Sequence, residues 1–362
     1  MTSIETVFQS MQEIGLYFDA ETWRRELILI KTKLLKSQER AKNLLSQPRH
    51  LDLFGESDLN LDSPLETSKA LQETQNPQEA LLALKEYRET AKLIQTYGDA
   101  FLEHVHPQTS RIHAVFVPEG TSTGRVSCHH PNLQNLPSDP RFQACLVAPA
   151  GKKLIHADYA ACELRILADF SGDPVFLKAF EEDRDLHSEV AQALFGSTRY
   201  RDQAKAINFG LIYGIGAKSL AKSLSVSQPE AERLLSQYFQ KHTAIQRYLE
   251  GCVQSAYAKG YVETRLGRRL YLDTQQDISR IAKNMPIQGT AAEIIKLAMT
   301  RIHERLLEFK DAYLVNMIHD ELVAESLEAD AEAVKHILIH EMEAAQREIT
   351  PRVRPKAEAW SG

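Results

Sequence analysis

Acidic residues interrupt apolar segments that otherwise have the composition of β-strands. Residues 153–159 (Lys-Leu-Ile-His-Ala-Asp-Tyr) form a short apolar segment that predicts a strand and carries Asp158 near its end. Residues 312–318 and 322–325 predict two further strands, which meet at 319–321 (His-Asp-Glu). Strands normally avoid Asp, so these acids require a structural or a functional reason.

Each acidic site has a structural explanation when it is taken alone. Asp158 can cap the helix that follows, which is the favoured interpretation of that residue by itself. The stretch 319–321 can form a tight turn that is exposed to water. Together, however, the acids favour a metal site, because buried carboxylates need a cation or donors to offset their desolvation.

Two strand-associated acids, Asp158 and Asp320, suit a pair of Mg²⁺ ions. Such ions bind oxygen ligands and keep coordination positions open for phosphate. Two metal ions about 4 Å apart can activate a hydroxyl nucleophile and stabilise a leaving pyrophosphate.

Basic and aromatic residues at helical spacing form a third feature. Arg201, Lys205 and Phe209 are four residues apart and are followed by Tyr213. On a helix they occupy successive turns, and the span from Arg201 to Phe209 is about 12 Å, comparable with a nucleotide. Cations at one end can hold phosphates while the ring covers a base. An amphipathic helix with a solvated basic end is the favoured alternative for this helix alone.

A polar, irregular stretch precedes the first acid. Residues 107–140 are rich in Gly, Pro, Ser, Asn and His, which predicts extended segments and turns. Within it, 121–125 (Thr-Ser-Thr-Gly-Arg) and 131–135 (Pro-Asn-Leu-Gln-Asn) carry a guanidinium and several amides. Such groups can read sugar edges and minor-groove acceptors without requiring one base sequence. As polar loops alone, they support no function.

Composition limits the class of protein. The 362 residues are 43% apolar and 25% charged, without a run long enough to span a bilayer, and no secretory signal opens the chain. We therefore expect a cytoplasmic protein that does not bind a membrane. Four cysteines without a C-x-x-C pair predict reduced thiols and no zinc site. The net charge of −6 argues mildly against a nucleic-acid partner.

Local clusters of basic residues weaken the argument from net charge against a nucleic-acid partner. One comprises Arg265, Arg268 and Arg269, and another comprises three lysines at 31, 33 and 36. Either cluster can line a positive groove. A solvated charged face is the favoured alternative for each cluster alone.

Helices dominate the rest of the predicted secondary structure. The pattern predicts helix over most of 1–47, a break at 47–62, a short helix after Asp62 or Ser63, a helix over 79–104, helices from 163–170 to about Arg305, and a last helix over 330–347.

Taken in order, these segments resemble the polymerase domain of the family A DNA polymerases, the group of bacterial DNA polymerase I. Residues 158–165 (Asp-Tyr-Ala-Ala-Cys-Glu-Leu-Arg) resemble motif A of that family, 201–214 resemble motif B and 319–321 resemble motif C. Further matches are 87–97, 121–137 and 284–290 (Asn-Met-Pro-Ile-Gln-Gly-Thr). Three ordered motifs are far more specific than any single one.

The resemblance implies an α+β, right-hand polymerase fold: a palm with an antiparallel sheet, helical fingers and a helical thumb. Residues 1–105 would form the thumb and the helices leading to it. Residues 106–185 would form the first part of the palm with motif A, 186–280 the fingers with motif B, and 281–362 the second part of the palm with motif C.

It also implies roles for individual residues in nucleotidyl transfer from a dNTP to a primer 3′-hydroxyl. The catalytic residues would be Asp158, Asp320 and Lys205; the ligands of two Mg²⁺ ions, which Mn²⁺ can replace, would be Asp158, Asp320, the Tyr159 carbonyl and Glu321; the nucleotide-binding residues would be Arg201, Lys205, His187, Phe209, Tyr213 and Glu163; and the DNA-binding residues would be Arg125, Gln288, His319, Asn132, Gln134, Asn135, Lys92, Thr96 and Tyr97. The implied partners are primer-template DNA and dNTP, with replication or repair proteins left open.

The chain departs from the family pattern at several places. Motif A has Ala160, Ala161 and Cys162 where the family usually has a polar residue, glutamine and an aliphatic residue. A long basic, Ser/Thr-rich thumb segment is missing between about Gln72 and Glu79, and the fingers are shortened before Arg201 and after Tyr271, so we expect a weak grip on DNA and low processivity. Because Met1 lies at the start of the thumb, we also expect no proofreading exonuclease.

Other functions remain open at this level. One is a catalytically impaired subunit that only binds primer-template. A second is a related RNA polymerase, against which Glu163 and Phe209 argue. A third is the use of RNA templates as a reverse transcriptase, because the altered motif A lies near the template-primer path.

Overall fold

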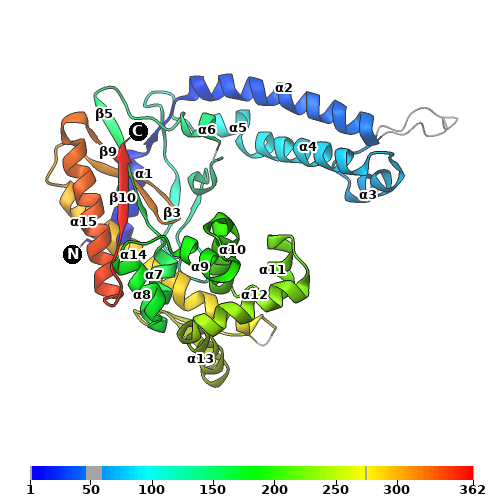
Figure 1. The fold of residues 1–362 in the computed structure, drawn as a ribbon. Coiled ribbons are helices and arrows are strands. Elements are labelled where there is room, and N and C mark those ends of the chain that lie inside the picture. The colour runs from blue at the N-terminus through cyan, green and yellow to red at the C-terminus, as the bar shows by residue number, and fades with distance from the viewer. Residues whose placement is uncertain (1, 46–58, 138, 274, 362) are drawn as a thin grey trace. The chain divides into compact units, whose positions relative to one another are not determined.

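The computed structural model describes residues 2–45, 59–137, 139–273 and 275–361, and these form two compact units (Figure 1). Unit 1 contains residues 1–14, 114–134 and 149–362, and unit 2 contains 15–113 and 135–148. No helix among the described residues combines the length and the apolar character needed to cross a bilayer.

A four-stranded antiparallel sheet organises unit 1. Its strands are β10 (Ala357–Ser361), β5 (Lys152–Tyr159), β9 (Glu321–Leu327) and β8 (Tyr313–Ile318), in that order. Their apolar segments predicted β5, β8 and β9, and the structure confirms all three. Strand β10 was not predicted, although it pairs with the whole second half of β5.

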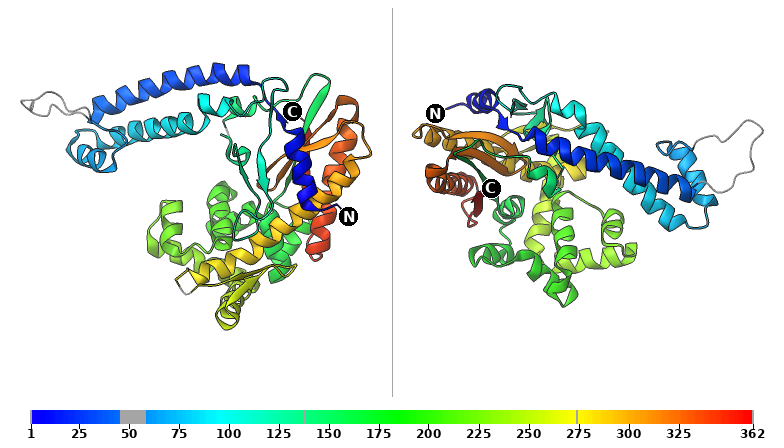
Figure 2. Two further views of the ribbon diagram at one scale, coloured as in Figure 1. Left: turned by 180° about the vertical axis from the view of Figure 1, so that it is seen from behind. Right: turned by 90° about the horizontal axis from the view of Figure 1, so that it is seen from above.

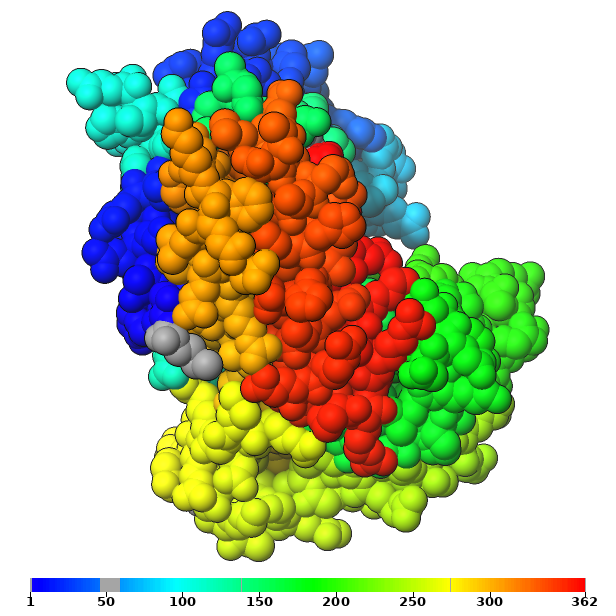
Figure 3. All heavy atoms as spheres, turned by 90° about the vertical axis from the view of Figure 1, so that its left-hand side faces the viewer, coloured from blue at the N-terminus to red at the C-terminus, as the bar shows by residue number. Residues whose placement is uncertain are grey.

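Long helices cover this sheet. Helix α15 (Ala331–Ile349) contacts β5, β9 and β10, and it also packs against α14 (Ile278–Leu306). On the face shown in Figure 3, α15 and the chain leading to β10 lie side by side at the surface. Helix α1 (Ile4–Ile14) contacts both β8 and α14, as the views in Figure 2 show.

The remaining helices of unit 1 follow β5 in the chain. They are α7 (Cys162–Ser171), α8 (Pro174–Glu181), α9 (Leu186–Phe195), α10 (Arg201–Ile212), α11 (Ala217–Leu224), α12 (Gln228–Lys241) and α13 (Thr243–Lys259). Local sequence fixes several starts, because Asp173, Asp185 and Ser227 accept hydrogen bonds from the first turns of α8, α9 and α12.

Two small hairpins complete unit 1. Strands β3 (Val115–Val117) and β4 (Ser127–His129) lie in the stretch for which extended segments were predicted. Strands β6 (Tyr261–Glu263) and β7 (Arg269–Tyr271) interrupt a region for which only helices were predicted. That prediction was wrong there, because three-residue strands are too short to show an alternation.

Unit 2 is mostly helical. It contains β1 (Leu16–Tyr17), α2 (Ala20–Leu45), α3 (Pro64–Glu73), α4 (Pro77–Tyr97), α5 (Asp99–Leu102), β2 (Arg111–Ile112) and α6 (Pro140–Gln143). The predicted cap of α3 is confirmed, because the Ser63 hydroxyl accepts a hydrogen bond from the Glu66 amide. The predicted helices over 1–47 and 79–104 are each divided, at Gly15 and at Gly98. Most of the predicted break at 47–62 lies outside the described residues.

Candidate active site

Asp158 lies in a row of acids that crosses three strands. In the sheet register it stands opposite Glu321 on β9 and opposite Glu358 on β10, so all three project from the same face. The next residue, Tyr159, projects from the other face, where its hydroxyl donates to the Met342 carbonyl at 2.7 Å. The residue before α7 is Ala161, in a left-handed conformation, so the capping interpretation of Asp158 is wrong.

The acid row holds Asp158 in an unfavourable electrostatic environment. Burial, followed by the charges of Asp320, Glu321 and Glu358, raises the pKa of Asp158 to about 7. Its Oδ1 atom is buried and accepts no hydrogen bond from the described residues. Like charges on directly opposed strand positions repel each other, so this arrangement favours a cation at Asp158.

Asp320 stands at the tip of the turn between β8 and β9. His319, beside it, has a φ of 57°, a value that few residues other than Gly adopt. His319 and Asp320 are exposed, as a turn open to water would be. The protein atoms around Asp320 nevertheless displace enough water to raise its pKa, although its own backbone N–H, His319 and Arg125 oppose that effect. Asp320 and His319 line a pocket of about 390 Å³, which also receives Arg125 and Phe209.

Glu321 is engaged by a residue that the sequence analysis did not single out. The Nδ1 atom of His156 lies 2.5 Å from Glu321 Oε1, and its ring stacks on Trp360 of β10 at 5.5 Å. His156 precedes Asp158 by two positions, so both share one face of β5. This two-residue separation from Asp158 is the sequence feature that could have identified His156.

These groups fit divalent metal ions. Asp158 and Glu321 share one face of the sheet, and Asp320 in the adjacent turn is close enough to raise the pKa of Asp158. The buried Oδ1 atom of Asp158 has no hydrogen-bond donor within the described chain, so a cation could bind there in place of one. Carboxylate oxygens are the ligands that Mg²⁺ prefers. The Tyr159 side chain is buried on the other face of the sheet, so this residue can offer only its backbone.

Helix α10 carries Arg201, Lys205 and Phe209 on successive turns, as predicted. Arg201 and Lys205 line a second pocket of about 420 Å³, and Phe209 lines both this pocket and the one beside Asp320. The two pockets therefore adjoin at Phe209. Lys205 forms no ion pair with the residues that the structure describes. A further cation in the second pocket, Lys356, was not predicted; it lies 2.9 Å from Asp183.

Arg201 and His187 are held by neighbours. The Arg201 Nε atom donates to Asp185 Oδ2 at 2.6 Å. Partial burial raises the pKa of Asp185, but hydrogen bonds from Arg201 and Ser188 outweigh it and keep the pKa below its ordinary value. His187 is buried beside Phe209 and lies 3.0 Å from the Asn208 amide, and burial lowers its pKa.

Glu163 lies between Arg125 and Tyr213. Its carboxylate pairs with the Arg125 guanidinium, and the Tyr213 hydroxyl lies near enough to favour its charged form. Burial raises the pKa of Glu163, against the opposing effects of both partners. All three residues line the pocket that contains Asp320.

The loop that carries Arg125 is fixed by α14 and by one arginine of the basic cluster. Lys296 of α14 donates to the Gly124 carbonyl at 3.2 Å. Gly124 has a φ of 80°, and an added Cβ would lie 2.9 Å from Arg268, whose guanidinium pairs with Glu119. The other two arginines of the cluster are also paired, Arg265 with Asp169 and Arg269 with Glu263.

Gly289→Ala is expected to destabilise the chain by about 1–3 kcal/mol, although Ala normally favours a helix. A Cβ at Gly289 would lie 2.4 Å from the Thr264 side chain and 3.0 Å from the Thr123 carbonyl, so the loop before Arg125 must shift. Thermal and denaturant unfolding measure the effect. Gly251→Ala in α13 is the matched control, because its Cβ would meet nothing within 4 Å. Equal stability of the two variants would contradict the packing argument.

The remaining predicted DNA-binding residues differ in exposure. Gln134 lines the pocket with His319, and Asn132 and Asn135 are exposed. Gln288 is buried in α14. In unit 2, Lys92 and Thr96 are exposed on α4, whereas Tyr97 packs against Trp23 and Phe101 and donates to the Asn135 carbonyl. Tyr97 therefore has a packing role, and its predicted DNA contact stays a prediction.

The fold is that of a nucleic-acid polymerase domain. It matches a solved structure described as the POL domain of Pol1 from M. smegmatis in complex with DNA primer-template and dNTP, with a TM-score of 0.87 and 27% identity. The match covers 99% of this chain and 69% of that one. It confirms the predicted α+β right-hand fold.

Sequence comparison gives the family. The profile described as DNA polymerase family A matches residues 21–362, and this chain belongs to that family. Among its relatives are DNA polymerase I of Caldicellulosiruptor bescii, 32% identical over 94% of this chain, and the thermostable DNA polymerase I of Thermus aquaticus, 38% identical over 71%. The chain spans 44% and 33% of the length of these two relatives.

Proposed function

We propose that this chain is a template-directed DNA polymerase that transfers a nucleotide from a dNTP to a primer 3′-hydroxyl. One observation carries the proposal: Asp158, with its orphaned oxygen and raised pKa, lies near Asp320, and the pocket that Asp320 lines adjoins, at Phe209, a second pocket lined by Arg201 and Lys205 of α10. The relatives are named as DNA polymerases, and the solved relative is described with primer-template and dNTP.

Asp158, Asp320 and the Tyr159 carbonyl would hold two Mg²⁺ ions, with Glu321 as a further acid and Mn²⁺ as a substitute. When bound, these ions activate the attacking hydroxyl and offset the charge of the leaving group. The chain's own contribution is to fix the carboxylates at the ends of paired strands, so that their geometry is set before substrate arrives.

Helix α10 would hold the triphosphate. Arg201, Lys205 and His187 lie around the second pocket, and Lys205 would donate a proton to the leaving pyrophosphate. Phe209, at the junction of the two pockets, would pack against the nucleotide. Glu163 and Tyr213, on the other side of this ring, would crowd the 2′ position of the sugar.

Three of the residues proposed to contact DNA line the first pocket, namely Arg125, Gln134 and His319. Arg125, His319 and Gln288 would contact the primer terminus or the minor groove, and Asn132, Gln134 and Asn135 the template side. Lys92 and Thr96 would contact duplex phosphates. In this proposal 1–105 serve as thumb, 186–280 as fingers, and 106–185 and 281–362 as palm.

Primer extension with all four dNTPs, Mg²⁺ and a primed DNA template tests the function. The proposal requires template-dependent growth of the primer. Binding of primer-template without extension would identify a binding subunit instead. An RNA template and an rNTP mixture test the other two alternatives, and excision of a mismatched primer end tests the expectation that the chain does not proofread.

Asp185→Asn is expected to lower the KM for dNTP about 2- to 5-fold and to leave kcat unchanged. Asp185 holds the guanidinium of Arg201, and an exposed ion pair of this kind is worth up to about 1 kcal/mol. Asn still caps α9, so the helix start is preserved. Steady-state incorporation kinetics measure the change.

Asp139→Asn is the matched control, because Asp139 also caps a helix and pairs with an arginine, Arg141, but lies in unit 2. It should leave the KM unchanged. A higher KM in Asp185→Asn would show that the pair supports nucleotide binding rather than competing with it.

A further inference from the structure

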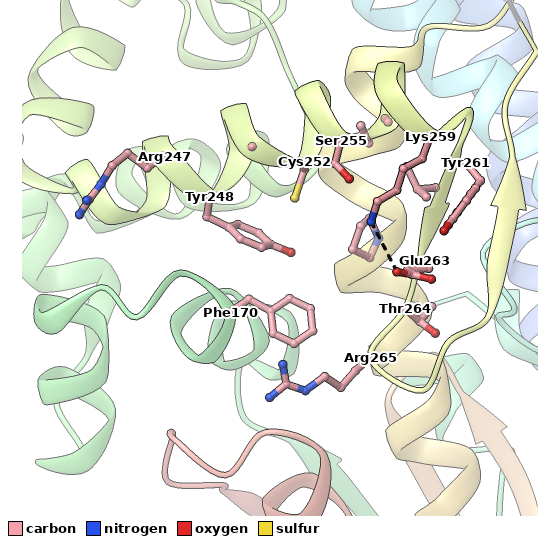
Figure 4. A pocket seen from close by; sticks show the side chains of 15 residues that line it. Phe170, Arg247, Tyr248, Cys252, Ser255, Lys259, Tyr261, Glu263, Thr264 and Arg265 are labelled. Carbon is pink, nitrogen blue, oxygen red and sulfur yellow. Dashed lines mark ion pairs between the residues drawn. The ribbon is translucent and has the colours of Figure 1, made fainter.

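A third pocket in unit 1 is separate from the candidate active site. Its volume is about 440 Å³, and it shares no lining residue with the other two pockets. Helix α13 forms one wall with Tyr248, Cys252 and Ser255, and β6 with the following turn forms the other (Figure 4). The volume falls within the range of about 300–1,000 Å³ that is usual for small-molecule sites.

The lining carries more positive than negative charge. Arg247, Lys259 and Arg265 line the pocket together with a single lining carboxylate, that of Glu263, and Arg265 also pairs at 3.6 Å with the buried Asp169. Glu263 is shared, because it lies 3.9 Å from Lys259 and also pairs with Arg269 at 3.2 Å. Arg247 is exposed and forms no ion pair within the described ranges of the chain, but its side chain points away from Phe170 and Arg265 (Figure 4). The lining as a whole carries a net positive charge, and Arg265 is the cation beside the aromatic rings.

Aromatic rings give the pocket a second recognition element. Phe170 and Tyr248 lie 5.8 Å apart at an angle of 58°, and both face the cavity (Figure 4). The Arg265 guanidinium lies 5.4 Å from the Phe170 ring, which places a cation beside a stacking surface. A ligand with a planar aromatic group and a phosphate would use both elements at once.

We propose that this pocket binds one nucleotide, with its base against Tyr248 and Phe170 and its phosphate beside Arg265. The nucleotide is either a free mononucleotide or one residue of a single strand, since both present the same ring and phosphate. The site does not depend on the proposed polymerase activity, because none of its residues belongs to the candidate active site.

Photolabelling with 8-azidoadenosine 5′-monophosphate in EDTA tests the site, and peptide mapping locates the label. Label is expected on residues 247–265. Lys205→Ala, which weakens the proposed active site, should leave this label unchanged, so that failure of the polymerase proposal and failure of this one are distinguishable. Label that is absent from 247–265 would overturn the proposal.

Gly251→Phe is the decisive variant. Gly251 lines the pocket within α13, and an added Cβ meets nothing within 4 Å, so a ring can fill the cavity without a clash at its base. Replacement of a helical glycine also favours the helix. The label on 247–265 should fall about tenfold or more in this variant and in Arg265→Gln.

Gln254→Phe adds the same ring to an exposed position of α13 outside the pocket and should keep the label. Undiminished labelling of Gly251→Phe, with unfolding temperatures equal to the unmodified chain, would overturn the proposal. Competition distinguishes a free mononucleotide from one residue of a single strand as the natural ligand. Unlabelled AMP displaces the probe from a site for free nucleotides. A single-stranded oligodeoxynucleotide displaces the probe more strongly than AMP from a site for a strand.

Discussion

Asp158→Asn is expected to reduce nucleotide incorporation at least about a thousandfold and, in the same protein, to raise the stability of the metal-free chain. Both effects have one cause. The Asp158 carboxylate is held beside Glu321 and Glu358 with a buried oxygen that accepts no hydrogen bond within the described chain. That position is useful for holding a metal ion and unfavourable without one.

The sign of the stability effect follows from the pKa. The pKa of Asp158 is raised from 3.8 to about 7 by burial and by neighbouring acids. A carboxyl group with a raised pKa in the folded state stabilises the fold only while it is protonated, so its contribution is lost as pH rises from about 4 to about 7. At pH 8 in EDTA, Asp158→Asn should therefore be more stable than the unmodified chain by roughly 1–3 kcal/mol.

Denaturant unfolding in EDTA at pH 5 and pH 8, with and without Mg²⁺, measures this contribution. The gain should be smaller at pH 5, and Mg²⁺ should stabilise the unmodified chain more than the variant. Asp99→Asn, which removes an exposed acid paired with Lys31 in unit 2, should change neither incorporation nor the response to Mg²⁺. A variant that is less stable than the unmodified chain at pH 8 would contradict the assigned role of Asp158.

Glu163→Ala is expected to raise the ratio of rNTP to dNTP incorporation about 10- to 200-fold. The Glu163 side chain is buried between Arg125 and Tyr213 in the pocket that contains Asp320. Its removal opens space where a ribose 2′-hydroxyl would lie in the proposed function. It also frees Arg125, so the efficiency of dNTP incorporation should fall as well.

Single-nucleotide incorporation with matched dNTP and rNTP measures the ratio. Tyr213→Phe is the control, because it keeps the ring and removes only the hydroxyl that lies near Glu163. Its ratio should change much less than that of Glu163→Ala. An unchanged ratio in Glu163→Ala, with dNTP incorporation intact, would exclude Glu163 from sugar selection.

Features that depend on local sequence were predictable. Asp158 and Asp320 stood out because strands disfavour acids, and both lie where the sequence placed them, at the ends of β5 and between β8 and β9. The spacing of Arg201, Lys205 and Phe209 predicted a helix with these side chains on successive turns, and α10 confirms it. Local periodicity contains this information.

Features that depend on distant pairing were not predictable. Strand β10 has the short sequence Ala-Glu-Ala-Trp-Ser, and only its register with β5 places Glu358 opposite Asp158. The same holds for His156, whose contact with Glu321 requires the pairing of β5 with β9. Burial was not predictable either, because nothing local shows that Tyr97 lies in an aromatic core or that Gln288 is buried.

The pairing of β5 with β9 and β10 also affects the order in which the chain folds. Residues 152–159 pair with 321–327 and 357–361, and all of the helices from α7 to α14 lie between the first two segments. Contacts between such distant segments form slowly, because a long loop must close before they contribute. Recovery of activity after dilution from denaturant should therefore lag behind recovery of helical signal. No partly folded species should be active, since Asp158 meets its neighbouring acids only when the sheet has closed.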